Sequence, residues 1–123
     1  MIKGFEKITH ELTEEEKKLI QPFIVGLSKK IGKENAISNK TIRQKFQENR
    51  SLKISDVRVR KVINHIRRND LLPLLCSNSK GYYIAKTRDE VNDYLIGLKQ
   101  RISEQQTIHD SIKRQFEKKI LNS

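Results

Sequence analysis

Apolar residues recur at helical spacing in three successive segments of the first half of the chain. In the third segment they fall at i, i+3, i+4 and i+7, which is the pattern of a helix with one buried face. The sequence therefore predicts three helices before residue 73. The positions that carry the pattern are Leu19, Ile20, Phe23, Ile24 and Leu27, then Ile42 and Phe46, then Val59, Val62, Ile63 and Ile66.

Each predicted helix follows a residue that commonly caps helix N-termini. Thr13 and Glu16 have the spacing of a capping box at the start of the first helix. Ser38 and Ser55 precede the second and third helices. Pro22 lies inside the first apolar set, where proline is expected to kink or restart the helix.

The pattern changes after Pro73. Residues 74–76 form a short apolar run, residues 77–81 have turn chemistry, and residues 82–85 are aromatic and β-branched. Two short strands around a polar loop of five residues predict a β-hairpin.

A long helix is predicted from residue 87 to residue 121, because this stretch contains no proline and begins with a second capping box at Thr87 and Glu90. Its apolar positions follow a heptad seam with two polar members, and its length is roughly 50 Å. We expect the first three seam residues to pack on the preceding domain and the remainder to pair with a second copy of the chain. The competing interpretation is a break near Ser103 that folds the last segment back. The seam residues are Val91, Leu95, Leu98, Ile102, Gln105, His109, Ile112 and Phe116.

These elements predict a mainly α fold with a small β-hairpin. Three helices followed by a hairpin have the order of a winged helix-turn-helix. We therefore expect a winged-helix domain over residues 1–90, with its core in about 13–86. A long C-terminal helix over residues 87–121 is expected to mediate a homodimer or a higher homo-oligomer.

The charge of the chain favours a polyanionic partner. There are 26 basic and 15 acidic residues, which gives a formal net charge of +11. Residues 34–88 hold thirteen of the basic residues and four of the acids. Such a segment suits nucleic acid or an anionic membrane surface, and a merely solvated basic surface is the alternative.

Membrane insertion and secretion are not expected. No stretch approaches the roughly 18 consecutive apolar residues of a spanning helix. A single cysteine, Cys76, cannot form an internal disulfide and is expected to be buried as a small apolar side chain. The expectation is a reducing compartment, the cytoplasm.

The outer face of the third helix carries the strongest functional signal. It is basic with one amide, and no acid lies between Asp56 and Asp70. Arginine and lysine donate to guanine or phosphate, and asparagine pairs with adenine. The second helix and the hairpin loop are expected to add phosphate contacts, and one of Tyr82 and Tyr83 to reach DNA while the other joins the core. The predicted DNA-binding residues are Arg58, Arg60, Lys61, Asn64, His65, Arg67 and Arg68 on the third helix, Lys40, Arg43 and Lys45 on the second, and Lys80 in the loop.

Residues 57–102, VRVRKVINHIRRNDLLPLLCSNSKGYYIAKTRDEVNDYLIGLKQRI, resemble small phage and prophage winged helix-turn-helix proteins. In those proteins a recognition helix is followed by a short hairpin with a GYY element, then T-x-x-E and a helix. The S-K-G-Y-Y-I element is the most specific part of the likeness. The resemblance implies a DNA-binding winged helix in a phage or phage-derived setting, and it transfers no catalytic residue.

An enzyme finds little support in the sequence. There is no glycine-rich phosphate loop. His10, His65 and His109 are far apart and have no neighbouring cysteine, so neither a metal site nor a cofactor is expected. The prediction is non-enzymatic binding of double-stranded DNA by a phage or prophage regulator or replication accessory protein. The alternatives are a DNA-recognising assembly protein of the terminase small subunit type and a protein-interaction module.

Overall fold

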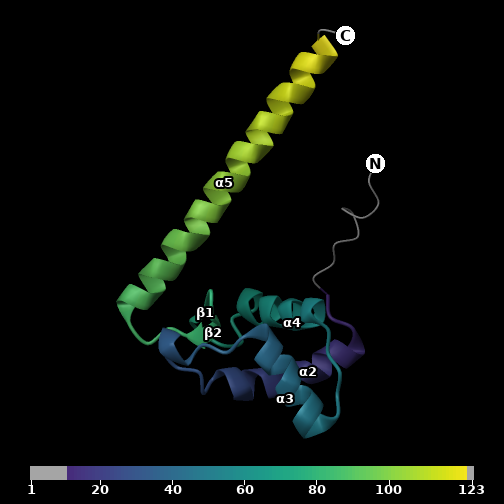
Figure 1. Ribbon diagram of the computed structural model, residues 1–123, viewed down its shortest axis with the longest axis vertical. Coiled ribbons are helices and arrows are strands. Elements are labelled where there is room, and N and C mark those ends of the chain that lie inside the picture. Colours follow the sequence, from purple (N-terminus) through teal and green to yellow (C-terminus); the bar gives the residue numbers. More distant parts are fainter. Residues whose placement is uncertain (1–10, 122–123) are drawn as a thin grey trace.

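The computed structural model describes residues 11–121, so the first ten residues of the predicted domain lie outside it. The chain is mainly helical, with a two-stranded hairpin and a long C-terminal helix that projects from the rest (Figure 1). The elements are α2 (Glu14–Leu27), the 3-10 turn η1 (Lys33–Asn35), α3 (Asn39–Arg50), α4 (Asp56–Arg68), β1 (Leu75–Asn78), β2 (Gly81–Ile84) and α5 (Arg88–Leu121).

Helix α4 lies at the centre of the core. Four of its five apolar residues are completely buried, as their helical spacing predicts, and they pack against α2 and α3. The rings of Phe23 on α2 and Phe46 on α3 complete this packing, with centroids 5.1 Å apart. The fully buried residues of α4 are Val59, Val62, Ile63 and Ile66.

Local signals set the helix ends. The predicted capping box forms at α2, where the Thr13 hydroxyl accepts from the backbone N–H of Glu16 and the Glu16 carboxylate accepts from the N–H of Thr13. Helix α2 continues through Pro22 as one element, so the predicted restart does not occur. Helix α3 ends at Ser51, whose left-handed conformation, with φ of 50°, closes the helix.

The hairpin has a tighter turn than the sequence suggested. Strand β1 pairs with β2 from Leu75 opposite Ile84 to Asn78 opposite Gly81. Only Ser79 and Lys80 therefore form the turn, and the predicted five-residue loop is wrong. Its outer residues join the ladder because strand pairing satisfies their backbone groups.

A third segment, between α2 and α3, lies against β2. Ile37 and Tyr82 exchange two backbone hydrogen bonds of 2.8 Å each, and Ile31 bridges to Ile84. At Gly81 a side chain could not fit, because a Cβ would lie 2.1 Å from the carbonyl oxygen of Ile37. The sequence analysis missed this pairing, since residues 31–37 are too short and too polar to predict a strand.

Helix α5 is anchored to the hairpin at its first two turns. Cys76, Tyr83 and Ala85 form a second buried cluster, against which Val91 and Tyr94 pack. Burial raises the pKa of the Cys76 thiol, which is therefore a neutral core side chain.

The start of α5 has half of the predicted capping box. The Thr87 hydroxyl accepts from the N–H of Glu90 at 3.1 Å. The buried Glu90 carboxylate instead accepts from the backbone N–H of Lys86 at 2.9 Å and of Lys33 at 3.2 Å. Glu90 thereby joins α5 to the segment before α3.

Beyond its anchor, α5 leaves the rest of the protein. It is continuous through Ser103, so the alternative of a break with a folded-back segment is wrong. Leu95 was expected to pack on the domain, but 54% of its surface is exposed, whereas Leu98 is half-buried. Figure 1 shows the helix projecting with no element beside its second half.

Candidate nucleic-acid interface

The exposed face of α4 carries a row of three polar residues. Arg60, Asn64 and Arg68 are spaced four residues apart, so they follow one another along a single side of the helix. All three are exposed because the opposite side of α4 is fully buried. Within residues 11–121, Arg68 has no ion pair. This row can donate to phosphate or to base edges.

One member of the row has an acidic neighbour. The guanidinium of Arg60 lies 2.8 Å from the carboxylate of Asp56, one turn earlier on α4. Both side chains are at least half exposed, so the pair contributes little to stability. Arg60 can therefore exchange Asp56 for a phosphate at small cost.

Two predicted contacts are instead tied to α2. Lys61 was expected on the outer face, but its ammonium lies 2.9 Å from the buried carboxylate of Glu16, and the Arg58 guanidinium lies 3.2 Å from the same group. Burial raises the pKa of Glu16. Hydrogen bonds from the N–H of Thr13 and from Lys61 outweigh that effect and hold this pKa at about 2.

Arg67 faces the hairpin rather than the exposed side of α4. Its Nε donates to the carbonyl oxygen of Leu75 at 3.1 Å. Its guanidinium carbon lies 5.5 Å from the ring centroid of Tyr82 and 5.6 Å from that of Tyr94. Arg67 therefore joins α4, the hairpin and α5, a role that its place in a basic run did not reveal.

The remaining predicted residue of α4 lies at the margin of the exposed face. His65 is half-buried, and its Nδ1 lies 3.4 Å from the side-chain amide of Asn69. That amide also donates to the backbone carbonyl of His65 at 2.8 Å. His65 borders the exposed row without belonging to it.

The predicted basic residues of α3 separate onto different sides. Lys40 is exposed near the start of the helix. The Nε of Arg43 donates to the side chain of Asn39 at 2.8 Å, and Asn39 donates to the carbonyl of Asp56 at 3.2 Å. Arg43 thus supports the junction of α3 with α4, whereas Lys45 faces α2 instead.

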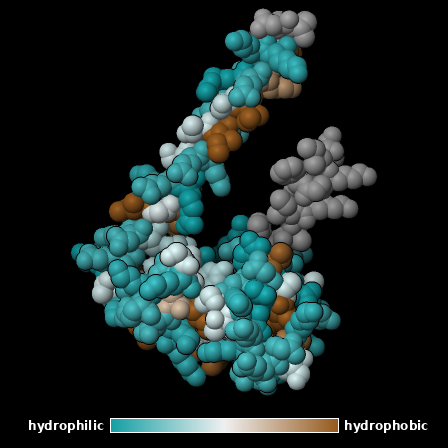
Figure 2. Space-filling view, in the orientation of Figure 1, coloured by the Kyte–Doolittle hydropathy of each residue, from teal (hydrophilic) through white to brown (hydrophobic). Residues whose placement is uncertain are grey.

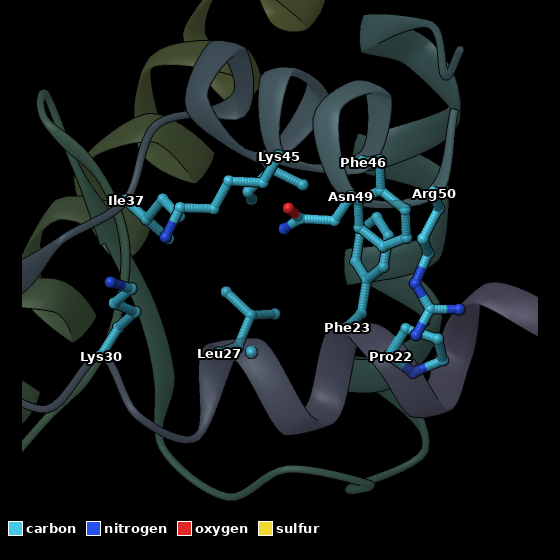
Figure 3. Close-up of a pocket in the computed structure, with 11 residues that line it drawn as sticks. Pro22, Phe23, Leu27, Lys30, Ile37, Lys45, Phe46, Asn49 and Arg50 are labelled. Carbon is cyan, nitrogen blue, oxygen red and sulfur yellow. The ribbon is translucent and has the colours of Figure 1, made fainter. Parts of the chain in front are cut away.

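Lys45 lines an opening between α2 and α3 with a volume of about 190 Å³. Figure 3 shows Lys45 extending along this opening toward Ile37, with Lys30 below it and Arg50 at the far end. The Arg50 guanidinium carbon lies 5.9 Å from the centroid of the Phe46 ring. The opening has an apolar floor and a cationic edge, and the three-residue row of α4 does not line it.

The hairpin presents its turn to solvent. The Asn78 side chain accepts from the N–H of Lys80 at 2.8 Å and from the N–H of Gly81 at 3.2 Å, which leaves the Lys80 side chain exposed at the tip. Tyr83 is buried, and Tyr82 packs against the main core beside Arg67. Tyr83 is thus the tyrosine that joins the core, and the half-buried Tyr82 lies on the hairpin away from its tip.

The seam of α5 does lie along one exposed side of that helix. Figure 2 shows apolar side chains in patches along it. A shallow apolar surface there includes Gln105, Ile108, His109, Ile112 and Phe116.

Comparison of the chain with protein-family models, curated proteins and solved structures gave no match. Within residues 11–121, no helix is long and apolar enough to cross a membrane.

Proposed function

We propose that the protein is a non-enzymatic binder of double-stranded DNA, in which residues 13–86 act as a winged helix-turn-helix and α4 enters the major groove. The observation that carries the proposal is the exposed row of Arg60, Asn64 and Arg68 on a helix whose other side is completely buried. A rigid helix with two arginines and one amide has the donors and the acceptor that base edges require.

The neighbouring elements support this orientation. Helices α3 and α4 are joined by a short turn, and the β1–β2 hairpin follows α4. Lys40 on α3 and Lys80 at the hairpin tip are exposed cations on elements that contact the DNA backbone in winged helices. Such contacts fix the register of a protein on DNA without reading its sequence.

The biological setting rests on the family resemblance alone. It favours a phage or prophage regulator, or a replication accessory protein, that works in the cytoplasm. A DNA-recognising assembly protein is the second candidate, because the exposed apolar side of α5 suits self-association. A ring of many subunits would favour the assembly protein, and a dimer would favour the regulator.

The test is fluorescence anisotropy with mixed-sequence duplex DNA over a series of salt concentrations. The variant carries Arg60→Ala, Asn64→Ala and Arg68→Ala, and leaves Lys61 in place because Lys61 neutralises the buried Glu16. The control, Arg114→Ala with Lys118→Ala, removes the same number of charges from α5.

The proposal predicts salt-sensitive binding that the α4 variant loses by at least about tenfold and the control retains. Absence of binding at low salt would contradict it. Equal loss in both variants would also contradict it, because affinity would then follow net charge rather than the α4 row.

A further inference from the structure

Most of the projecting half of α5 is apolar on one side and has no cover within the part of the chain that the structure describes. Ile102 is 66% exposed, Ile108 62% and Phe116 62%. Large side chains exposed in a row on an isolated helix indicate a surface that associates with another protein. The order of apolar and polar residues along this side of α5 indicates that a second copy of the chain covers it.

The six seam residues from Leu98 to Phe116 are symmetric about Thr107. If two copies of α5 lie antiparallel around that residue, Leu98 meets Phe116 of the other copy, and Ile102 meets Ile112. The two polar members then meet each other. The amide of Gln105 lies opposite the imidazole of His109, and these groups can form a hydrogen bond across the seam. Within these six positions every apolar residue faces an apolar residue, and each polar residue faces a polar one.

A residue beside the seam favours the same orientation. Ile108 lies next to the centre of symmetry, so in the antiparallel pair it meets its own counterpart. In a parallel pair with the same heptad register it would lie opposite Lys113. Only the antiparallel arrangement covers this exposed isoleucine with another apolar side chain.

The last turn of α5 carries Lys118 and Lys119. Antiparallel helices keep the lysines of the two copies at opposite ends of the coiled coil. Parallel helices would gather four lysines at one end, where like charges repel.

The length of the helix fits the same register. Leu121 lies opposite Asp93, so the pair covers about four heptads and stops where α5 meets the hairpin at Tyr94. Four heptads are long enough for a stable coiled coil. The matched pairs of the seam occupy residues 98–116 of this overlap, and beyond them Leu95 lies opposite Lys119.

We infer that α5 binds a second copy of this chain in an antiparallel coiled coil centred on Thr107. The two domains then lie at opposite ends of the pair. In this register the two α5 starts lie about 57 Å apart along the axis, the rise of roughly 38 helical residues. That exceeds the roughly 35 Å between half-sites one helical turn apart. At the α5 starts, the two domains are thus held farther apart than adjacent half-sites. The pairing itself does not depend on the proposed DNA binding.

Light scattering and cysteine cross-linking test the pairing on the whole chain. The mass should be twice the 14.5 kDa of the chain. In a Cys76→Ala background, a mixture of Leu98→Cys and Phe116→Cys variants should form disulfides between residues 98 and 116, identified by peptide mass spectrometry. Neither variant alone should cross-link, because identical positions lie about 27 Å apart along the axis.

A second pair, Ile102→Cys with Ile112→Cys, repeats the test if the first pair folds poorly. Ile112→Glu should make the protein monomeric, whereas Gln100→Glu on the opposite side of α5 should leave the dimer intact. A monomer at high micromolar concentration, an assembly larger than two, or disulfides formed by Leu98→Cys alone would overturn the inference. None of these readouts involves DNA, so they are independent of the test of DNA binding.

Discussion

The ammonium of Lys61 on α4 lies 2.9 Å from the carboxylate of Glu16 on α2, and the Glu16 side chain is only 5% exposed. The pair joins the first turn of α2 to the middle of α4. A buried carboxylate is stable in its charged form only when hydrogen bonds and cations compensate for lost solvation. The ion pair therefore helps to fix the orientation of α4 and of its exposed row.

The ion pair predicts a stability that depends on pH. The pKa of Glu16 in the folded protein is about 2, below its ordinary value of 4.5. A lowered folded pKa stabilises the protein above about pH 5, and the effect is lost as the pH falls from 5 toward 2. The contribution at neutral pH is about 3 kcal/mol.

We expect Glu16→Gln to lower the free energy of unfolding at pH 7 by 2 to about 3 kcal/mol. The free energies of unfolding of wild type and variant, measured by urea denaturation at a series of pH values, should converge near pH 2. Glu14→Gln is the matched control, because the Glu14 side chain is 87% exposed and pairs only at the surface. If the difference in free energy of unfolding between wild type and Glu16→Gln stayed constant between pH 7 and pH 3, the charge of Glu16 would not be the cause of that difference.

Arg67 should matter for the hairpin rather than for DNA. Arg67→Met keeps an unbranched apolar stem but removes the hydrogen bond to Leu75 and both ring contacts. The expected loss is about 1 to 2 kcal/mol. The loss is moderate because Nη2 of Arg67 is buried with no hydrogen-bond partner in the described structure.

Hydrogen exchange should detect this loss as faster exchange of the β1 and β2 amides. Arg68→Met, one residue along but exposed, should leave those amides unchanged while weakening DNA binding. If the two substitutions had the same effect on exchange, Arg67 would not have the joining role described above.

Gly81 should tolerate no side chain. It has a φ of 139°, and a Cβ there would meet the carbonyl of Ile37. Gly81→Ala is expected to cost at least about 2 kcal/mol and to lower the melting temperature. Lys80→Ala, the adjacent control, should melt like the wild type but bind DNA more weakly. Equal melting temperatures for both variants would mean that the pairing of residue 37 with β2 is dispensable.

Asn64 and Arg68 should differ in what they contribute to DNA binding. Loss of one phosphate contact reduces, by about one unit, the slope of log affinity against log salt concentration. We expect this reduction for Arg68→Ala. Asn64→Ala should leave the slope unchanged and reduce discrimination between sequences by about 1 to 3 kcal/mol. Affinity measured against a cognate and a shuffled duplex at several salt concentrations separates the two effects.

Much of the fold followed from the sequence because apolar spacing and caps are local signals. The buried face of α4 and the capping box at Thr13 were predicted correctly. The positions of the Lys61 and Arg67 side chains were not predicted correctly, because their partners lie on other elements. Glu16 gave one usable sign: it continues the spacing of Leu19 and Phe23, which placed an acid on the buried side of α2.

The turn length and the third paired segment were also missed. Both depend on backbone pairing with β2, which leaves little trace in a short polar sequence. The continuity of α5 was among the interpretations left open, and the structure decides it in favour of one helix. The exposure of Leu95 could not be predicted, since it depends on the angle at which α5 leaves the hairpin.

That angle makes α5 a lever. Within residues 11–121 the helix is held near Glu90, Val91 and Tyr94, and its other end at Leu121 lies about 40 Å from Tyr94. A change in tilt of about 10° at Tyr94 would move the far end by roughly 7 Å. Small adjustments of packing around Tyr94 can therefore shift the far end of α5, while the surface of α4 keeps its shape.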